Sequence, residues 1–314
     1  MIRLFYDSNI ALGSETSITI SSASPIKSAN AINQLWKEIF NFEKQFSRFI
    51  PTSELCFLNK NSGTKQIISK EFRDILINAK NISLTTEGLY NPFILPALQR
   101  SGYTKSFVVG AENDIHEDYS DRSVVSVDKM EIGEDWVRIP FKTAIDLGGI
   151  GKGYLADKLA VSLKDEFNGF IINLGGDIVT HGTNDQNSNW QIIIQDASSI
   201  ENKSIGTIKM PLSTYSVSSS GTFKKNGVNK GKAWHHLINP KTLEPAKSDI
   251  KLITIMSKLA VNSDTLASCG LILGSKDCIK FLKSHEIKNA LIQSNTPSKK
   301  PILVGDKILL ENNL

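Results

Sequence analysis

Cysteine is scarce in this sequence. Only three cysteines occur among 314 residues, namely Cys56, Cys269 and Cys278, and no Cys-x-x-Cys pair is present. This wide spacing argues against a disulfide framework and against a structural zinc site. So few unpaired cysteines fit a reducing compartment.

Long apolar runs are also missing. No stretch is long and apolar enough to span a bilayer, so we expect no membrane span. The first seven residues contain neither a long apolar region nor a lipid-anchor cysteine behind one. We therefore expect a cytoplasmic location, or a periplasmic one if a leader has been removed from the chain.

The sequence has no concentrated run of charge. Its net charge of +4 and its pI of about 8.8 reflect a basic excess that is spread along the chain. A nucleic-acid-binding protein would more often carry a basic stripe, so we expect no nucleic-acid partner. Low-complexity linkers and fixed-period repeats are absent too. Residues 1–314 are therefore expected to form one domain, or two intertwined subdomains.

Apolar periodicity predicts helices and strands in irregular order. Apolar residues recur at helical spacing in residues 32–46, and again in 72–82 behind a capping serine, Ser69. Further helices are expected over residues 154–167, 262–273 and 276–284, strands over 17–20, 170–174, 190–195 and 290–293, and hairpins over 124–137. This order favours a mixed α+β fold over a strictly alternating one.

The most informative tract covers residues 146–157, Asp-Leu-Gly-Gly-Ile-Gly-Lys-Gly-Tyr-Leu-Ala-Asp. Glycine lets a backbone approach a ligand closely and adopt positive φ. A helix that starts at such a turn offers unpaired N–H groups to a phosphate. A ligand-contacting role is favoured over a plain helix start for this tract, which includes Gly148, Gly149, Gly151, Lys152, Gly153 and Asp157.

Three other tracts are polar or glycine-rich where a core element would be apolar. In residues 46–59, Arg48 is a candidate anion ligand or helix cap, and Ser53 before Glu54 could start a short helix. Residues 173–177 follow a strand, where either a binding loop or a tight turn capped by Asp177 is possible. The third tract is Ser218-Ser-Ser-Gly-Thr222, which contains Ser220 and Gly221.

Two of the five histidines, His235 and His236, are adjacent. A neutral imidazole could take the proton from an attacking hydroxyl. For His235 we favour simple packing beside Trp234, whereas for His236 both interpretations stay open.

Asp264 and Ser268 are four residues apart, so on a helix they lie on one face. A carboxylate and a hydroxyl are hard oxygen donors that suit Mg²⁺ better than zinc. The alternative is that Asp264 is an acid in the first turn of a helix, where the helix dipole favours it.

Taken together, these tracts resemble the ApbE-type flavin transferases, the FAD:protein FMN transferase family. The resemblance rests on four blocks in the expected order, at residues 146–154, 173–177, 235–242 and 263–268. It implies an ApbE fold, T-fold-like, with largely antiparallel sheets and packed helices, and an FAD cleft that would lie between the two subdomains.

The resemblance also implies an activity. Family members bind FAD, use Mg²⁺ on its pyrophosphate, and move FMN onto a Thr or Ser hydroxyl of a target flavoprotein with release of AMP. An FAD pyrophosphatase and a non-catalytic FAD-binding protein are the alternatives. The second of these is suggested by Asn91 and Asn239, which stand where the family often has aspartate.

Roles for individual residues follow from the same resemblance. Asp264, Ser268 and the carbonyl of Gly149 are expected to bind the metal, and His236 is expected to help deprotonate the acceptor, so that His236 and Asp264 form the catalytic pair. Ser268 replaces the family's usual threonine and keeps its oxygen. The expected cofactor contacts are Arg48, Ser53, Glu54, Asn59, Gly148, Lys152, Asp157, Gly175, Gly176, Asp177, Ser220 and Gly221.

Overall fold

The computed structural model describes residues 1–106, 118–199, 203–223, 225–296 and 298–310. The chain divides into two compact units, and each is assembled from separate segments of sequence. Unit 1 comprises Met1–Ile39, Lys152–Gly221 and Ser248–Leu314, and unit 2 comprises Phe40–Gly151 and Thr222–Lys247.

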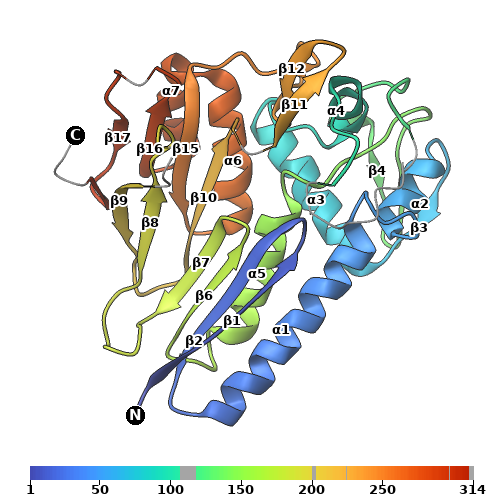
Figure 1. Ribbon diagram of the computed structural model, residues 1–314. Helices are drawn as coiled ribbons and strands as arrows, with labels where there is room; N and C mark the ends of the chain where they lie inside the picture. The colour runs from blue at the N-terminus through green and yellow to red at the C-terminus, as the bar shows by residue number, and fades with distance from the viewer. Residues whose placement is uncertain (107–117, 200–202, 224, 297, 311–314) are drawn as a thin grey trace. The chain divides into compact units, whose positions relative to one another are not determined.

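An eight-stranded sheet forms the centre of unit 1 (Figure 1). Every neighbouring pair of strands in it is antiparallel, which confirms the predicted sheet type. In order across the sheet, the strands are β1 (Arg3–Ala11), β2 (Ser14–Ser22), β6 (Gly169–Leu174), β7 (Asp177–Gly182), β10 (Tyr215–Gly221), β15 (Ile250–Ser257), β16 (Asn289–Ser294) and β17 (Ile302–Val304).

A second sheet of unit 1 has three strands, in the order β18 (Ile308–Leu310), β9 (Ser204–Lys209) and β8 (Gln191–Gln195). Its buried side chains share one apolar cluster with Val217 of β10, Met256 of β15 and Leu291 of β16. The two sheets therefore have a common core.

Helix α6 (Ala260–Leu273) packs against β7, β10 and β15, and Figure 1 shows it behind β10 and β15. Most of its residues are buried, which is typical of a helix enclosed on several sides. It is followed by α7 (Ser275–Ser284), which packs against it. The helices expected at 262–273 and 276–284 correspond to this pair.

The helix expected at 154–167 is α5 (Gly151–Leu163). It begins three residues earlier than predicted, so Gly151 and Gly153 lie in its first turn rather than in the preceding loop. Its first residue belongs to unit 2 and the rest to unit 1. Helix α1 (Pro25–Phe46) likewise begins in unit 1 and ends in unit 2.

Unit 2 contains one helix of 16 residues, several shorter helices, and short strands. Its helices are α2 (Glu54–Lys60), η1 (Pro92–Ile94), α4 (Leu95–Ser101), η2 (Val127–Lys129) and α3 (Lys70–Thr85). The expected cap of α3 is confirmed, because Ser69 Oγ accepts a hydrogen bond from the N–H of Phe72 at 3.1 Å.

The strands of unit 2 form one small sheet and two hairpins. The sheet has the order β3 (Gln66–Ile67), β5 (Trp136–Arg138) and β4 (Glu131–Ile132). Where hairpins were expected at 124–137, only the β4–β5 hairpin forms, because the 3-10 turn η2 occupies the start of that range. The hairpins are β11 (Asn226–Asn229) with β12 (Lys232–His235), and β13 (Ile238–Asn239) with β14 (Glu244–Pro245).

The predicted mixed α+β fold is thus confirmed. Among the described residues, no helix has both the length and the apolar character needed to cross a membrane.

Candidate functional site

Asp264 and Ser268 lie on α6 in unit 1, one helical turn apart. This places their side chains on the same face of the helix, as their spacing predicts. Asp264 is 7% exposed, so its carboxylate is almost entirely withdrawn from water.

Hydroxyl groups of β10 hold this part of α6 against the sheet. Ser218 Oγ lies 2.8 Å from Ser263 Oγ, and Ser220 Oγ lies 2.9 Å from Ser268 Oγ. Because side chains alternate along a strand, Ser218 and Ser220 share the face that meets the helix. The bond to Ser220 limits the rotamers open to the Ser268 side chain.

Lys152, in the first turn of α5, forms an ion pair with Asp177, the first residue of β7. Its ammonium also lies 3.3 Å from the carbonyl oxygen of Leu174. The side chain of Asp177 is 4% exposed and that of Lys152 is 20% exposed. A carboxylate buried this deeply without a partner would be strongly destabilising. Lys152 and Asp177, which were both expected to contact the cofactor, thus form an ion pair with each other.

Gly175 and Gly176 form the two-residue turn between β6 and β7, with φ of +70° and +101°. Positive φ at both positions is typical of a type I′ hairpin turn, which favours glycine. The N–H of Gly176 also donates to Asn173 Oδ1 at 2.8 Å. The tight-turn interpretation therefore accounts for both glycines, whereas Asp177 binds Lys152 instead of capping the turn.

The four glycines of the 146–157 tract lie against protein groups. None of the four has a positive φ. A Cβ on Gly153 would lie 2.7 Å from the carbonyl oxygen of Ala260, so this glycine allows α5 to approach the start of α6. A Cβ on Gly149 would meet the Tyr90 ring at an ordinary 3.5 Å. Close backbone contact within the protein explains Gly153 without any ligand.

Asp157 accepts hydrogen bonds from the first two N–H groups of α6. Its Oδ1 lies 2.7 Å from the nitrogen of Ala260, and its Oδ2 lies 2.9 Å from that of Val261. Burial raises the pKa of Asp157 to about 6, although these two hydrogen bonds lower it in part.

In unit 2, Arg48 is enclosed by protein groups. Its Nε lies 2.9 Å from Asp146 Oδ2, and both terminal nitrogens donate to the carbonyl of Tyr103 at 3.2 Å. The guanidinium also lies over the rings of Phe49 and Tyr103, at 4.2 and 4.4 Å from their centroids. Since Asp146 Oδ1 accepts the N–H of Gly148 at 2.8 Å, Arg48 helps to fix the glycine tract.

The other expected contacts of the N-terminal block also make hydrogen bonds within unit 2. Ser53 caps α2 by accepting from the N–H of Cys56, as the helix-start interpretation predicted. Glu54 accepts from the N–H and the hydroxyl of Ser69 at 2.6 and 2.8 Å. Asn59 is fully buried and exchanges two hydrogen bonds with the backbone of Ile145. Their contacts with a cofactor stay predictions.

The two adjacent histidines have different surroundings. His235 Nε2 donates to the carbonyl of Ala246 at 3.0 Å, and burial lowers the pKa of His235, which favours its neutral form. His236 Nδ1 lies 3.3 Å from the carbonyl of Lys225. A carbonyl only accepts, so Nδ1 of His236 carries a proton in this contact, and in the neutral imidazole Nε2 then carries the lone pair. This tautomer suits a base that acts through Nε2.

Two amides stand where the family more often has acids, and each serves nearby backbone. Asn91 accepts a hydrogen bond from the N–H of Phe93 at 3.0 Å. Its side-chain N–H also donates to the carbonyl of Val125 at 2.9 Å, and an ionised aspartate has no donor for this second bond. Asn239 accepts from the N–H of Lys241 at 2.9 Å. The donated bond thus explains the amide at Asn91, whereas the bond that Asn239 accepts would suit an aspartate equally well.

The structure also adds residues that sequence reasoning missed. No role was predicted for Asp146, although it opens the tract and links Arg48 to Gly148. Ser263 joins α6 to β10 through two hydroxyls, those of Ser216 and Ser218, at 3.0 and 2.8 Å. The alternating serines of 216–220 were the signal that could have predicted such a contact.

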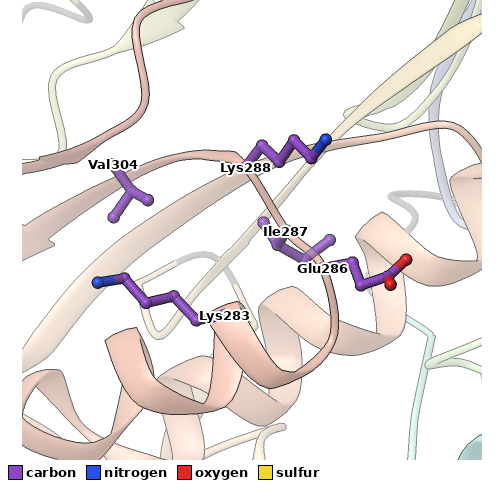
Figure 2. A pocket seen from close by; sticks show the side chains of 5 residues that line it. All are labelled: Lys283, Glu286, Ile287, Lys288 and Val304. Carbon is purple, nitrogen blue, oxygen red and sulfur yellow. The ribbon is translucent and has the colours of Figure 1, made fainter.

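One surface pocket of about 450 Å³ contains none of the expected site residues. It is lined by Lys283, Glu286, Ile287, Lys288 and Val304, and in Figure 2 the side chain of Lys283 extends to the left whereas those of Glu286 and Lys288 extend to the right. No cluster of three or more His, Cys, Asp or Glu side chains with metal-binding geometry occurs in the described part of the chain. The expected metal ligands include only one such side chain, Asp264.

Solved structures share this fold. The flavin transferase ApbE from Vibrio cholerae superposes with a TM-score of 0.79 at 20% identity and covers 97% of this chain and 98% of its own. The ApbE protein from Thermotoga maritima gives a TM-score of 0.80 at 20% identity, covering 96% and 97%. The fold is therefore that of the ApbE flavin transferases.

The chain belongs to the ApbE family, whose sequence model matches residues 12–292. A curated relative from Haemophilus influenzae, named FAD:protein FMN transferase, is 23% identical over 284 residues, covering 88% of this chain and 80% of its own. A relative of the same name from Buchnera aphidicola is 34% identical over 155 residues, covering 49% and 45%. The family resemblance and the expected class of enzyme, a flavinyltransferase, are confirmed.

Proposed function

We propose that this chain is a Mg²⁺-dependent FAD:protein FMN transferase. It would move the FMN half of FAD onto a Thr or Ser hydroxyl of a target flavoprotein and release AMP. The observation that carries the proposal is the pairing of Asp264 and Ser268 on one face of α6, with the Ser268 hydroxyl held by Ser220.

The donor atoms fit magnesium. Asp264 offers a carboxylate and Ser268 a hydroxyl, and Mg²⁺ prefers hard oxygen ligands of this kind. A cation would also compensate the buried charge of Asp264, which is 7% exposed. The carbonyl of Gly149 is proposed as a further ligand on the sequence resemblance alone. When bound, Mg²⁺ supplies charge neutralisation and orientation for the pyrophosphate.

Lys152 would supply a second positive charge for the pyrophosphate. Its ion pair with Asp177 restricts the ammonium to the first turn of α5, close to the turn formed by Gly175 and Gly176. A phosphoryl transfer depends mainly on such positioning and charge stabilisation, because the protein does little covalent chemistry in it.

His236 would act on the acceptor. The hydroxyl oxygen of the acceptor attacks the phosphorus of the FMN half, and the bond from that phosphorus to the bridging oxygen breaks, so that AMP leaves. The hydroxyl proton passes to Nε2 of His236, whose Nδ1–H is directed at the carbonyl of Lys225. One phosphate ester forms as one pyrophosphate bond breaks.

Chromatography of the nucleotides tests this proposal and its two alternatives. The purified chain is incubated with FAD and Mg²⁺, with and without an acceptor flavoprotein. Transfer predicts AMP without free FMN, and only when the acceptor is present. AMP and FMN in equal amounts without acceptor would mean that the chain is a pyrophosphatase. Intact FAD under both conditions, with FAD bound, would mean that it is a binding protein.

A further inference from the structure

Helix α6 begins without a cap of its own. Its N-cap residue is Leu259, whose side chain makes no capping hydrogen bond. The first N–H groups of a helix have no partner within the helix, and a buried helix start needs one from elsewhere. Asp157 of α5 supplies it, at 2.7 Å from the nitrogen of Ala260 and 2.9 Å from that of Val261.

A second contact joins the same two helices. Gly153 lies one helical turn before Asp157, so both residues lie on one face of α5. At Gly153 a Cβ would lie 2.7 Å from both the carbonyl oxygen of Ala260 and the Cα of Val261. Van der Waals contact at Gly153 and hydrogen bonds at Asp157 therefore fix the first turn of α6 from the α5 side.

The fixed turn leads directly to the proposed metal ligands. Asp264 and Ser268 follow Ala260 at intervals of four residues, so the three lie along one face of α6. On the sheet side, the hydroxyls of β10 hold Ser263 and Ser268. A helix held at both sides can move its ligands only if one set of contacts gives way.

We propose that Asp157 is a positioning residue, which holds the start of α6 so that Asp264 and Ser268 keep their places in the proposed Mg²⁺ site. It would act through the helix and not through contact with FAD. This inference rests on the proposed function. It replaces the expectation that Asp157 contacts the cofactor, because both of its carboxylate oxygens face backbone N–H groups of α6.

The same unit offers a matched control. Asp249 binds the start of α7 in a similar way, with one carboxylate oxygen 2.8 Å from the nitrogen of Ser275 and the other accepting from the Ser275 hydroxyl. Helix α7 carries none of the expected site residues. Replacing Asp249 therefore removes the cap of a helix that packs against α6 but carries none of the proposed ligands.

The test compares Asp157→Ala and Asp157→Asn with Asp249→Ala in the full chain. Amide hydrogen exchange follows residues 260–268, and calorimetry follows binding of Mg²⁺ to the chain in the presence of FAD. We expect faster exchange in 260–268 and roughly tenfold weaker Mg²⁺ binding for Asp157→Ala, as for other residues that orient metal ligands. Asp157→Asn should fall between Asp157→Ala and the wild type, because one acceptor oxygen remains.

The control variant Asp249→Ala should speed exchange at the start of α7 and leave Mg²⁺ affinity within about twofold of the wild type. Unchanged exchange in 260–268 and unchanged Mg²⁺ affinity in Asp157→Ala would overturn the inference. Weaker FAD binding with unchanged Mg²⁺ affinity would overturn it too and make Asp157 a cofactor contact. If the wild type binds no Mg²⁺ at all, the proposed metal site fails, and the exchange data alone show whether Asp157 fixes α6.

Discussion

The hydroxyl of Ser220 on β10 lies 2.9 Å from the hydroxyl of Ser268 on α6. This contact joins an expected cofactor residue to an expected metal ligand. Within unit 1, it links the sheet directly to one of the two side chains of α6 that are proposed to bind the metal.

Ser220→Ala should therefore weaken Mg²⁺ binding. Ser268 would gain rotamer freedom, and its oxygen would lose the partner that orients it. Loss of such a partner typically weakens metal binding about 10–100-fold. Titration with Mg²⁺, followed by the rate of transfer, measures the effect.

Ser219→Ala is the matched control for that change. Ser219 also forms a hydroxyl bond, at 2.8 Å to Thr254, but as the next residue along the strand it faces the other side of the sheet. Its loss should leave the Mg²⁺ dependence unchanged. Equal effects of Ser219→Ala and Ser220→Ala would contradict a positioning role for Ser220.

The Lys152–Asp177 ion pair should be costly to break from either side. Lys152→Met leaves the buried carboxylate of Asp177 without its partner, and such changes lower the free energy of unfolding by roughly 3–5 kcal/mol. The double variant Lys152→Met, Asp177→Leu should recover part of this loss, because no buried charge remains. Urea unfolding of the three proteins measures it.

FAD affinity distinguishes a role of Lys152 in binding the pyrophosphate from its structural role in the ion pair with Asp177. If Lys152 also binds the pyrophosphate, the double variant regains stability but not FAD binding. Recovery of both would restrict Lys152 to a structural role.

His236→Asn should lower the rate constant of transfer by roughly 10²–10⁴-fold, the usual contribution of a general base. FAD affinity should stay close to that of the wild type, because the imidazole is proposed to act on the acceptor. His235→Gln serves as the comparison, since His235 donates to the carbonyl of Ala246 and has no proposed chemical role. It should lower stability and change the rate only a few-fold. A larger loss of rate in His235→Gln than in His236→Asn would reverse the assignment.

Stability should depend on pH through Asp157. Its pKa is raised from 3.8 to about 6 by burial, so in this range the folded protein binds a proton that the unfolded chain has released. The carboxyl of Asp157 contributes its full share to the free energy of unfolding below pH 3.8. This contribution falls by on the order of 3 kcal/mol as the pH rises to about 6. The stability of Asp157→Asn relative to the wild type should therefore increase across this range in urea unfolding.

Asp249 should show the opposite dependence, in a lower range of pH. Hydrogen bonds from Ser275 hold the pKa of Asp249 below its ordinary 3.8. The contribution of Asp249 to the stability of the fold is present above that value and is lost as pH falls through the lower, folded-state pKa.

If the stability of Asp157→Asn had the same pH slope as that of the wild type, the raised pKa of Asp157 would be wrong.

Local patterns predicted much of the fold. Strong helical periodicity and a capping serine located α3, and the spacing of Asp264 and Ser268 placed both on one helix face. The start of α5 differs from the prediction, because glycines are typical of loops whereas Gly151 and Gly153 lie in a helical turn. Position 153 requires glycine because the start of α6 packs too closely against it to leave room for a side chain.

Long-range contacts were beyond local patterns. Asp157 caps a helix that begins 103 residues later, and no feature near either segment indicates the pairing. Lys152 and Asp177 both appeared in separate tracts, yet only the fold places them together. The family resemblance grouped these residues, but it could not distinguish residues that bind a ligand from those that hold its binding elements.

The mass of an acceptor flavoprotein, after incubation with FAD, Mg²⁺ and this chain, tests the proposed transfer most directly. We expect a gain equal to FMN less one water on a single Thr or Ser, absent when Mg²⁺ is removed and lost in Asp264→Ala. An acceptor whose mass stays unchanged while FAD is bound, or a gain that Asp264→Ala leaves intact, would contradict it.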